Sequence, residues 1–291
     1  MTRPDSPADW QTALRGQAYL ADRGLSTALF LALSLGRPLL LEGEAGVGKT
    51  EVAKVLASAF GVELIRLQCY EGIDASQALY EWDYARQLLH IRALSERAAA
   101  DDQAVEELFG PRFLLERPLL KALRAGNQAV LLVDEVDRAD DEFEAFLLEV
   151  LSDFQVTVPE IGTIRAEQPP AVIVTSNRTR ELHDALRRRC LYHWIDYPSV
   201  EREVEIVSLR APELPAELAR KVSEAVSRLR GLDLAKRPGV AETIDWAHAL
   251  AMLGAGALDI QTVSDTLSAV VKDHDDQILV RQHLVEVVGD G

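Results

Sequence analysis

The sequence has few of the features that mark secreted or metal-binding proteins. It contains only two cysteines in 291 residues, Cys69 and Cys190. Neither belongs to a C-x-x-C pair, so no zinc ribbon or redox motif is readable. We expect both thiols to be small core residues of a protein in the reducing cytoplasm.

Positive charge is also scarce. The chain has 31 Lys and Arg residues against 47 Asp and Glu residues, which gives a net charge of −16. Non-specific binding to DNA or RNA depends on Lys and Arg side chains that neutralise phosphates. The composition therefore disfavours a nucleic-acid partner, although it leaves room for a local basic patch.

Long uninterrupted apolar runs are missing as well. The longest, residues 28–41, is broken by Gly36, Arg37 and Pro38, and it cannot cross a bilayer as one helix. Residues 1–6 lack the apolar centre of a signal peptide. We expect a cytoplasmic protein without membrane insertion. A content of 48% hydrophobic and 27% charged residues is typical of a globular chain with a packed core.

The first two thirds of the chain alternate between strand-like and helical patterns. Most of the short apolar segments are separated by helical periodicity, and they cover residues 39–41, 64–67, 129–133, 171–174 and 192–195. This alternation predicts an α/β fold with a parallel sheet covered on both faces. A helix is expected over residues 50–60, ended by Gly61.

Residues 199–291 show helical patterns and no confident strand. One apolar stripe runs from Leu218 to Leu229, opened by Pro215 and closed by Gly231. Further helices are expected over residues 244–253, 260–271 and 278–288. We therefore predict an α/β nucleotide-binding domain over residues 1–198 and a small all-helical domain over residues 199–291.

The most specific motif follows the first predicted strand. It fits the pattern G-x-x-x-x-G-K-[ST] and consists of Gly43, Glu44, Ala45, Gly46, Val47, Gly48, Lys49 and Thr50. Its glycines let backbone N–H groups approach phosphates, and the N-terminus of the following helix favours negative charge. Lys49 is expected to reach the β- and γ-phosphates, and Thr50 to hold Mg²⁺. The loop predicts a nucleoside triphosphate as ligand.

A second apolar strand, residues 130–133, ends in Asp134 and Glu135. This is the Walker B arrangement, in which Asp134 holds Mg²⁺, usually through water, and Glu135 polarises the water that attacks the γ-phosphate. A solvated acidic loop is the alternative. The phosphate loop earlier in the chain favours the catalytic interpretation.

Two further polar features follow. Asn177 ends the strand-like run 172–176, and an amide there can align the attacking water; a simple turn is the alternative.

Arg187, Arg188 and Arg189 are consecutive, so they cannot all point at one phosphate. Taken alone, such a triplet is more typical of a surface run that pairs with nearby acids.

This order of parts resembles an AAA+ ATPase, and in detail the MoxR family, particularly its CoxD-like branch. The resemblance is carried by residues 37–43, 66–72, 80–84, 146–149 and 185–194. It implies a P-loop αβα sandwich followed by a helical lid, and an ATP-hydrolysing chaperone-type motor that uses ATP and Mg²⁺. It also implies work on a partner protein in metalloenzyme maturation or metal-cofactor insertion, together with a protein that carries a von Willebrand factor A domain.

The resemblance also assigns residues. It makes Asn177 sensor 1 and makes Arg188 or Arg189 an arginine finger, with Arg189 the better match, in a homo-oligomeric and typically hexameric ring. It places a family insertion at residues 71–82 and a hairpin at residues 154–165, where a turn-like interruption between two β-prone runs supports the hairpin.

Several points stay open at this stage. Arg237 precedes its predicted helix, so sensor 2 is unassigned, and related chains commonly have Asn where Asp137 stands. The aromatic residues Tyr80, Trp82 and Tyr84 fit a substrate-gripping patch and core packing equally well. The alternatives for function are an AAA+ nucleic-acid-processing motor, a small-molecule P-loop kinase and a nucleotide-gated binding module.

Overall fold

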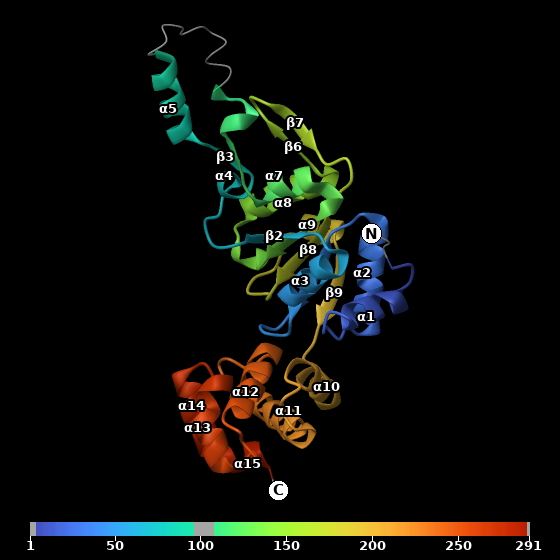
Figure 1. Ribbon diagram of the computed structural model, residues 1–291, viewed down its shortest axis with the longest axis vertical. Coiled ribbons are helices and arrows are strands. Elements are labelled where there is room, and N and C mark those ends of the chain that lie inside the picture. The colour runs from blue at the N-terminus through green and yellow to red at the C-terminus, as the bar shows by residue number, and fades with distance from the viewer. Residues whose placement is uncertain (1–3, 96–107, 290–291) are drawn as a thin grey trace. The chain divides into compact units, whose positions relative to one another are not determined.

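The computed structural model describes residues 4–95 and 108–289. The chain divides into two compact units (Figure 1). The first consists of Met1–Ala13, Asp22–Glu42 and Ala53–His193, and the second consists of Leu14–Ala21, Gly43–Val52 and Trp194–Gly291. The phosphate loop thus clusters with the helical C-terminal part of the chain.

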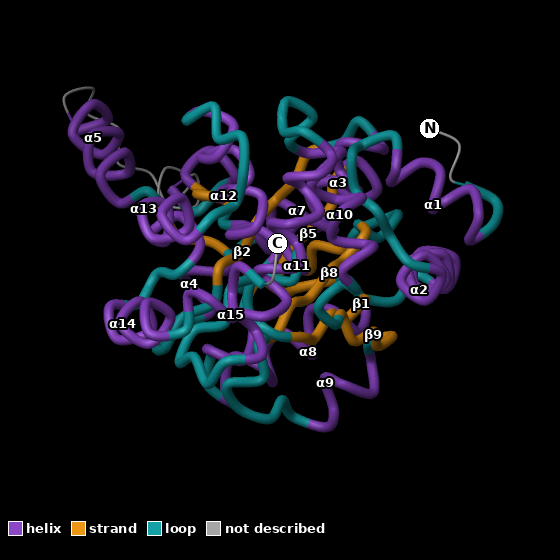
Figure 2. Tube along the Cα trace, turned by 90° about the horizontal axis from the view of Figure 1, so that it is seen from below, coloured by secondary structure: helices purple, strands orange, loops and turns teal. Residues whose placement is uncertain are grey.

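A five-stranded sheet forms the centre of the first unit, in the order β2-β5-β8-β1-β9 (Figure 2). The strands are β1 (Leu39–Gly43), β2 (Glu63–Gln68), β5 (Ala129–Asp134), β8 (Ala171–Ser176) and β9 (Leu191–Ile195). The pairs β2 with β5, β5 with β8 and β8 with β1 are parallel. All residues of β1, β5 and β8 are buried, because helices cover both faces. The predicted α/β fold with a parallel sheet is confirmed.

Several helices of this part of the chain begin with a side-chain cap, and α2 also has a cap at its end. Asp22 caps α2 by accepting a hydrogen bond from the N–H of Leu25, and Gly36 ends that helix in a left-handed conformation. The elements are α1 (Pro7–Arg15), α2 (Arg23–Leu35), α3 (Lys49–Phe60), α4 (Ala75–Ala78), α5 (Tyr84–Ser95), α7 (Pro118–Ala125), α8 (Asp141–Asp153), α9 (Asp184–Arg189), and the short 3₁₀ turns η1 (Pro111–Phe113), η2 (Gly126–Gln128) and η3 (Val136–Arg138).

Two antiparallel hairpins accompany the large sheet. The predicted one is present as β6 (Gln155–Val158) and β7 (Gly162–Arg165). The other pairs β3 (Tyr80–Trp82) with β4 (Leu114–Glu116), so the chain between β2 and β5 departs from the sheet over a longer stretch than the predicted insertion at residues 71–82.

The aromatic residues near β3 have different environments. Trp82 is only 7% exposed and packs edge-on against Tyr80 and Phe109, so core packing explains it. Tyr84 is 62% exposed at the start of α5.

Cys69 and Cys190 are buried free thiols of the same core, as predicted, and burial raises the pKa of each to about 12.

The C-terminal part of the second unit is helical around its own core, with Trp246 fully buried. Its helices are α10 (Val200–Arg210), α11 (Ala216–Gly231), α12 (Val240–Met252), α13 (Ile260–Val270), α14 (His274–Gln282) and α15 (Leu284–Val288). The single helix expected over residues 278–288 is wrong. The chain breaks at His283, which leaves helical geometry, and α14 begins earlier because Asp273 caps it. Among the described residues no helix is both long enough and apolar enough to cross a membrane.

A buried ion pair ties three of these helices together. Arg230 of α11 and Glu203 of α10 form a two-pronged pair with both N–O distances at 2.7 Å, and their side chains are 9% and 0% exposed. The Thr243 hydroxyl of α12 donates to the same carboxylate at 2.7 Å, and the Arg230 guanidinium lies 4.5 Å from the centre of the Tyr197 ring. Removing one partner leaves an uncompensated buried charge.

We expect Arg230→Met to lower the free energy of unfolding by about 3–5 kcal/mol, because Glu203 would stay buried without its cation. Urea unfolding of the full chain, followed by circular dichroism, measures this. Arg220→Met is the matched control on the same helix: Arg220 is 65% exposed and pairs loosely with Glu224 at 3.8 Å. The control should cost about 0.5 kcal/mol or less. Equal losses in the two variants would contradict the prediction.

Candidate functional site

The predicted phosphate loop has the backbone geometry that its glycines permit. Gly43, Gly46 and Gly48 all have positive φ, at 155°, 77° and 95°. Residues other than glycine rarely adopt such backbone conformations, which explains why glycine stands at these three positions of the loop. The loop leads directly into α3, whose first residue is Lys49. The first N–H groups of a helix have no carbonyl partner within the helix, and an anion is the kind of ligand that suits them.

Lys49 is folded over the loop rather than extended into solvent. The residue is 6% exposed, and its Nζ donates hydrogen bonds to the carbonyl oxygens of Gly43 and Glu44, both at 2.7 Å. Its ammonium group is therefore held over the loop backbone, where a polyphosphate binds in loops of this type. Thr50 follows in the first turn of α3 and is half-buried.

The helical part of the second unit touches the phosphate loop directly. The N–H of Val240 donates to the carbonyl oxygen of Gly46 at 2.9 Å. A Cβ on Gly46 would lie 2.8 Å from the Cα of Gly239, so the two backbones can approach this closely only without side chains. Arg237 lies before α12, as expected, and sensor 2 remains unassigned.

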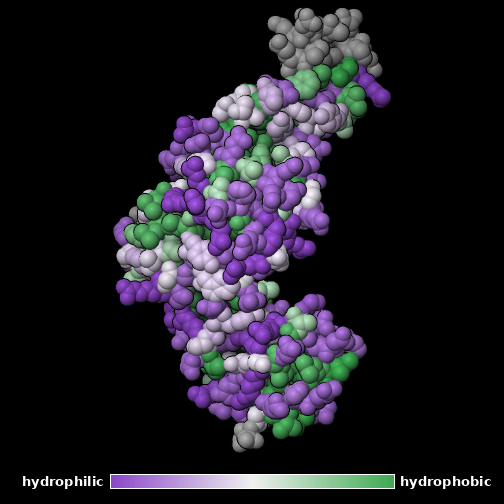
Figure 3. Space-filling model, turned by 180° about the vertical axis from the view of Figure 1, so that it is seen from behind, coloured by the Kyte–Doolittle hydropathy of each residue, from purple (hydrophilic) through white to green (hydrophobic). Residues whose placement is uncertain are grey.

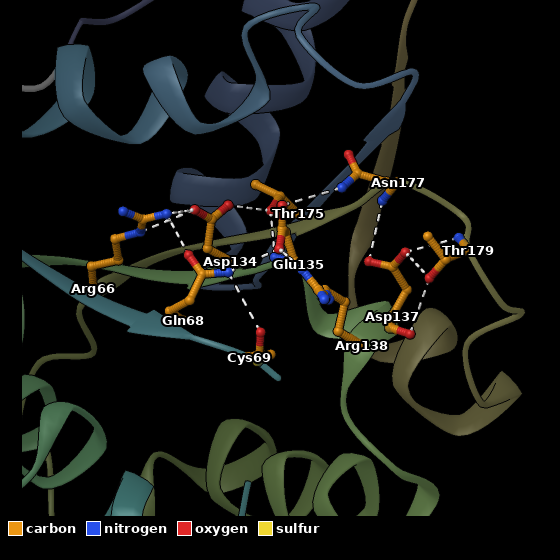
Figure 4. A network of polar contacts seen from close by, with 10 residues as sticks. All are labelled: Arg66, Gln68, Cys69, Asp134, Glu135, Asp137, Arg138, Thr175, Asn177 and Thr179. Atoms are coloured by element: carbon orange, nitrogen blue, oxygen red, sulfur yellow. Dashed lines mark hydrogen bonds and ion pairs between the residues drawn. The ribbon is translucent and has the colours of Figure 1, made fainter. Parts of the chain in front are cut away.

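The predicted acid pair Asp134 and Glu135 and the predicted sensor Asn177 lie in the first unit, at the ends of neighbouring strands (Figure 4). Asp134 is 2% exposed at the end of β5. Its Oδ2 accepts from the Arg66 guanidinium at 2.6 and 3.0 Å, and its Oδ1 accepts from the Thr175 hydroxyl at 2.6 Å. The charge of this buried carboxylate is thus compensated from β2 on one side and β8 on the other.

Glu135 is held by backbone and side chain together. Its backbone is left-handed, with φ 54° and ψ 50°, and its N–H donates to the Thr175 hydroxyl at 2.9 Å. The carboxylate accepts from Gln68 Nε2 at 3.0 Å and from Asn177 Nδ2 at 3.4 Å, while Arg138 lies 3.4 Å away (Figure 4). The structure therefore brings the predicted general base and the predicted sensor amide into contact.

Asp137 joins the turn after β5 to the loop after β8. The residue is 2% exposed, and its Oδ2 accepts from the N–H and the hydroxyl of Thr179 at 2.8 and 2.7 Å. Its Oδ1 accepts from the N–H of Asn177 at 3.2 Å. Both carboxylate oxygens are used, which gives the acid at this position a structural reason: an amide would have only one acceptor oxygen.

A cavity of about 970 Å³ opens beside these residues within the first unit. Its lining includes Glu135 and Asn177, and the Glu135 side chain is 33% exposed. Solvent water therefore reaches this carboxylate. The rest of the lining is rich in acids and comes mainly from η3, the start of α8 and the loop before α9: Glu71, Asp137, Arg138, Ala139, Asp140, Asp141, Glu142, Thr179 and Arg180.

The three consecutive arginines lie in different environments. Arg187 is half-buried and faces the Glu42 carboxylate at 4.0 Å. Arg188 and Arg189 are exposed, and within the described residues their side chains make no hydrogen bond or ion pair. The two finger candidates are therefore the members of the triplet whose side chains have no polar partner among the described residues.

Arg66, Gln68 and Thr175 are parts of this site that the sequence analysis did not identify. Arg66 and Gln68 are two residues apart on β2, so they point to the same face, and Gln68 lies opposite Asp134 in the strand register. Arg66 and Gln68 lie in the segment 66–72 that carries the family resemblance, but that resemblance assigned them no role. Only the neighbouring positions of β2, β5 and β8 reveal them.

We expect Asp137→Asn to destabilise the chain by about 1–3 kcal/mol, because the amide leaves at least one buried donor of the Asn177 to Thr179 loop unpaired. Urea unfolding gives the loss, and hydrogen exchange should show weaker protection of the Asn177 and Thr179 amides. Asp153→Asn is the control, since Asp153 is exposed at the end of α8. Unchanged protection in Asp137→Asn would refute the assigned role.

Comparison with known proteins finds relatives among curated bacterial proteins. Curated relatives include the uncharacterized protein YehL of Escherichia coli, 26% identical over 69% of this chain and 54% of its own length. The uncharacterized protein YojN of Bacillus subtilis is 28% identical over 69% of this chain and 61% of its own length. The chain thus spans between half and two thirds of these relatives.

Solved structures support the fold. Two variants of RuvB from Thermotoga maritima align with TM-scores of 0.52 and 0.51 at 19% and 20% identity, over 95% and 94% of this chain and 76% and 75% of theirs. At this identity the likeness concerns the fold alone. A family model described as an AAA domain of the dynein-related subfamily matches residues 38–190. Because that match covers more than half of the chain, the protein belongs to this AAA domain family.

Proposed function

We propose that this chain binds ATP with Mg²⁺ and hydrolyses the ATP to ADP and phosphate. The observation that carries the proposal is the geometry of Glu135: a solvent-accessible carboxylate held by the amides of Gln68 and Asn177 at the end of β5. Membership of the AAA domain family and the glycine conformations of the phosphate loop support it.

The residues present fit both ligands chemically. Backbone N–H groups of the loop and the Lys49 ammonium suit a polyphosphate. The Thr50 hydroxyl and the Asp134 carboxylate are oxygen donors of the kind that Mg²⁺ prefers. When bound, Mg²⁺ neutralises charge on the phosphate oxygens. Arg66 forms an ion pair with Asp134 in this structure. We propose that this guanidinium gives up part of its contact with Asp134 when Mg²⁺ is bound.

The hydrolytic step assigns a separate task to each side chain. A water oxygen attacks the γ-phosphorus, the bond to the ADP oxygen breaks, and the Glu135 carboxylate takes the proton of the water. The Asn177 amide, which contacts Glu135, accepts from or donates to the water and fixes its direction. Gln68 restrains the carboxylate from the side of β2.

We expect Glu135→Gln to lower turnover by about 10²- to 10⁴-fold, because an amide cannot take the proton. ATP affinity should stay close to that of the parent, whereas Lys49→Ala should lose binding. A free-phosphate assay and a fluorescent-nucleotide titration measure the two effects. Glu142→Gln, at the rim of the same cavity, is the matched control and should keep its turnover. Full activity in Glu135→Gln would remove the proposed base.

We also propose a homo-oligomeric ring, of the hexameric kind that the family resemblance implies. In such a ring Arg189, or otherwise Arg188, would reach the γ-phosphate held by the next copy. The support is that both side chains are exposed and uncommitted while Arg187 faces Glu42. An arginine finger supplied in this way contributes about 10³- to 10⁵-fold in rate in well-studied ATPases and GTPases.

Mixed rings test the shared site. Subunits with Glu135→Gln keep the finger and lose the base, while subunits with Arg189→Ala keep the base and lose the finger. Neither homogeneous ring should turn over ATP at more than a small fraction of the parent rate, and the mixture should regain activity. If Arg188→Ala rather than Arg189→Ala behaves in this way, the finger is Arg188. No recovery with either arginine variant would refute a finger in trans.

We propose that hydrolysis drives remodelling of a partner protein, in a MoxR-like role in metalloenzyme maturation with a von Willebrand factor A protein. The family resemblance suggests the role, and α5 supports a protein partner. Tyr84, Leu88 and Ile91 recur at helical spacing and are 62%, 61% and 43% exposed (compare the hydrophobic surface beside the grey segment in Figure 3). The net charge of −16 disfavours the alternative of a nucleic-acid motor.

Capture with Glu135→Gln in ATP and Mg²⁺ tests the partner class, because this variant should hold its partner without releasing it. Mass spectrometry should identify a von Willebrand factor A protein or a metalloenzyme subunit. Its recovery should be lost in Lys49→Ala and weakened in Leu88→Asp, with Leu88→Met as the matched control. Salt-sensitive recovery of DNA or of DNA-processing proteins would favour the nucleic-acid motor instead.

A further inference from the structure

Hydrogen bonds connect the start of strand β1 to the end of α9, the helix that carries Arg187, Arg188 and Arg189. The guanidinium of Arg37, two residues before β1, donates to the carbonyl oxygens of Arg188 at 2.6 Å, Arg189 at 3.0 Å and Cys190 at 3.4 Å. The N–H of Leu191 then donates to the carbonyl oxygen of Pro38 at 2.8 Å. One arginine side chain therefore binds three successive carbonyls where α9 ends.

This contact supplies what such a short helix lacks. The last carbonyls of a helix have no partner within the helix, and they form the negative end of its dipole. A helix of six residues, as α9 is, has little stability of its own. The fork of Arg37 satisfies the carbonyls and places a positive charge at the favourable end. A lysine at this position offers a single nitrogen that cannot span all three oxygens.

The end of the same strand holds the first arginine of the triplet. Glu42 is 3% exposed, and no group of the described residues donates a hydrogen bond to its Oε2. The cations that face this oxygen are Arg187 of α9 at 4.0 Å and Arg178, from the loop after β8, at 3.9 Å. A buried carboxylate is costly unless cations compensate it, so Glu42 keeps Arg187 turned toward the sheet.

The direction of Arg187 decides the directions of its neighbours. Successive residues of a helix point about 100° apart, because a turn contains about 3.6 residues. With Arg187 held toward Glu42, Arg188 and Arg189 point away from it, in agreement with their exposure. Leu186 is 1% exposed in the core and sets which side of α9 faces inward, and the contacts of Arg37 and Glu42 fix the end of the helix that carries Arg188 and Arg189.

We propose that Arg37 and Glu42 are positioning residues that fix α9 so that Arg188 and Arg189 are presented to a second copy of this chain. The proposal rests on the shared ATPase site of the proposed function, and it adds two residues that act through α9 rather than on the reacting atoms. Their effect therefore belongs to the subunit that supplies the finger and not to the subunit that supplies the base.

Mixed rings separate these two subunits. Arg37→Ala is first added to the Glu135→Gln subunit, which only supplies the finger, and this double variant is mixed with Arg189→Ala. Because a shift of about 1 Å in a catalytic group can cost about 100-fold in rate, we expect the recovered turnover to fall about 10- to 100-fold. Arg37→Lys in the same subunit should restore part of it. Arg23→Ala, an exposed arginine on α2, should leave it unchanged.

The reciprocal mixture is the decisive control. Arg37→Ala is placed instead in the Arg189→Ala subunit, which only supplies the base, and mixed with unaltered Glu135→Gln. Recovery should then match that of the parental mixture. Equal losses in the two placements would show general damage and overturn the proposal, as would no loss in either. Glu42→Gln should follow the same asymmetry through Arg187.

Failure of the proposed function has a different signature. If the parental mixture recovers no turnover with Arg189 or with Arg188 as the altered arginine, the finger in trans is wrong, and the presentation of these arginines is wrong with it.

Hydrogen exchange tests the contact between Arg37 and α9 itself. Arg37→Ala should accelerate exchange at the Leu186, Arg187 and Cys190 amides, which bond within this turn, and leave α8 unchanged. Unchanged exchange at α9 would refute the capping role.

Discussion

The parallel register of β2, β5, β8 and β1 is the constraint on which the catalytic geometry of the first unit depends. Parallel strands end at the same edge of a sheet, so polar residues that lie far apart in the chain meet there. Gln68 lies opposite Asp134 in this register, and Val133 lies opposite Val174, which brings Thr175 beside Asp134. A slip of one residue in any of these strands would turn the polar side chains to the other face.

Buried carboxylates then fix the loops that leave this edge. Asp134 takes its partners from the neighbouring strands, and Asp137 takes all of its three from the loop that carries Asn177. A buried charge that loses a partner costs more than the bond alone, because its desolvation is no longer offset. Glu42 differs, since its Oε2 is faced by two guanidinium groups at ion-pair distance without a hydrogen bond. These networks make the loops specific rather than merely stable.

The sequence reveals the parts of this arrangement whose signals are local. Five apolar strands, the glycine loop and the acid pair after β5 each lie within a few consecutive residues, so pattern and spacing predict them. Arg66 and Gln68 lie in a segment that carries the family resemblance, but their role was not readable, because it depends on β2 being next to β5. The break at His283 was missed since apolar periodicity continues across it, whereas the cap at Asp273 and the backbone at His283 set the helix ends.

The arginines around Glu135 and Asp134 are already paired with acids. Arg138 faces Glu135 itself, Arg66 binds Asp134, and Arg180 binds the buried Glu144. Among the described residues that line the cavity, each arginine is thus already paired with an acid. Phosphoryl transfer needs positive charge that is free to follow the developing charge on the γ-phosphate. Arg188 and Arg189, which are exposed on α9, are the residues that we propose to supply this charge from a second copy of the chain.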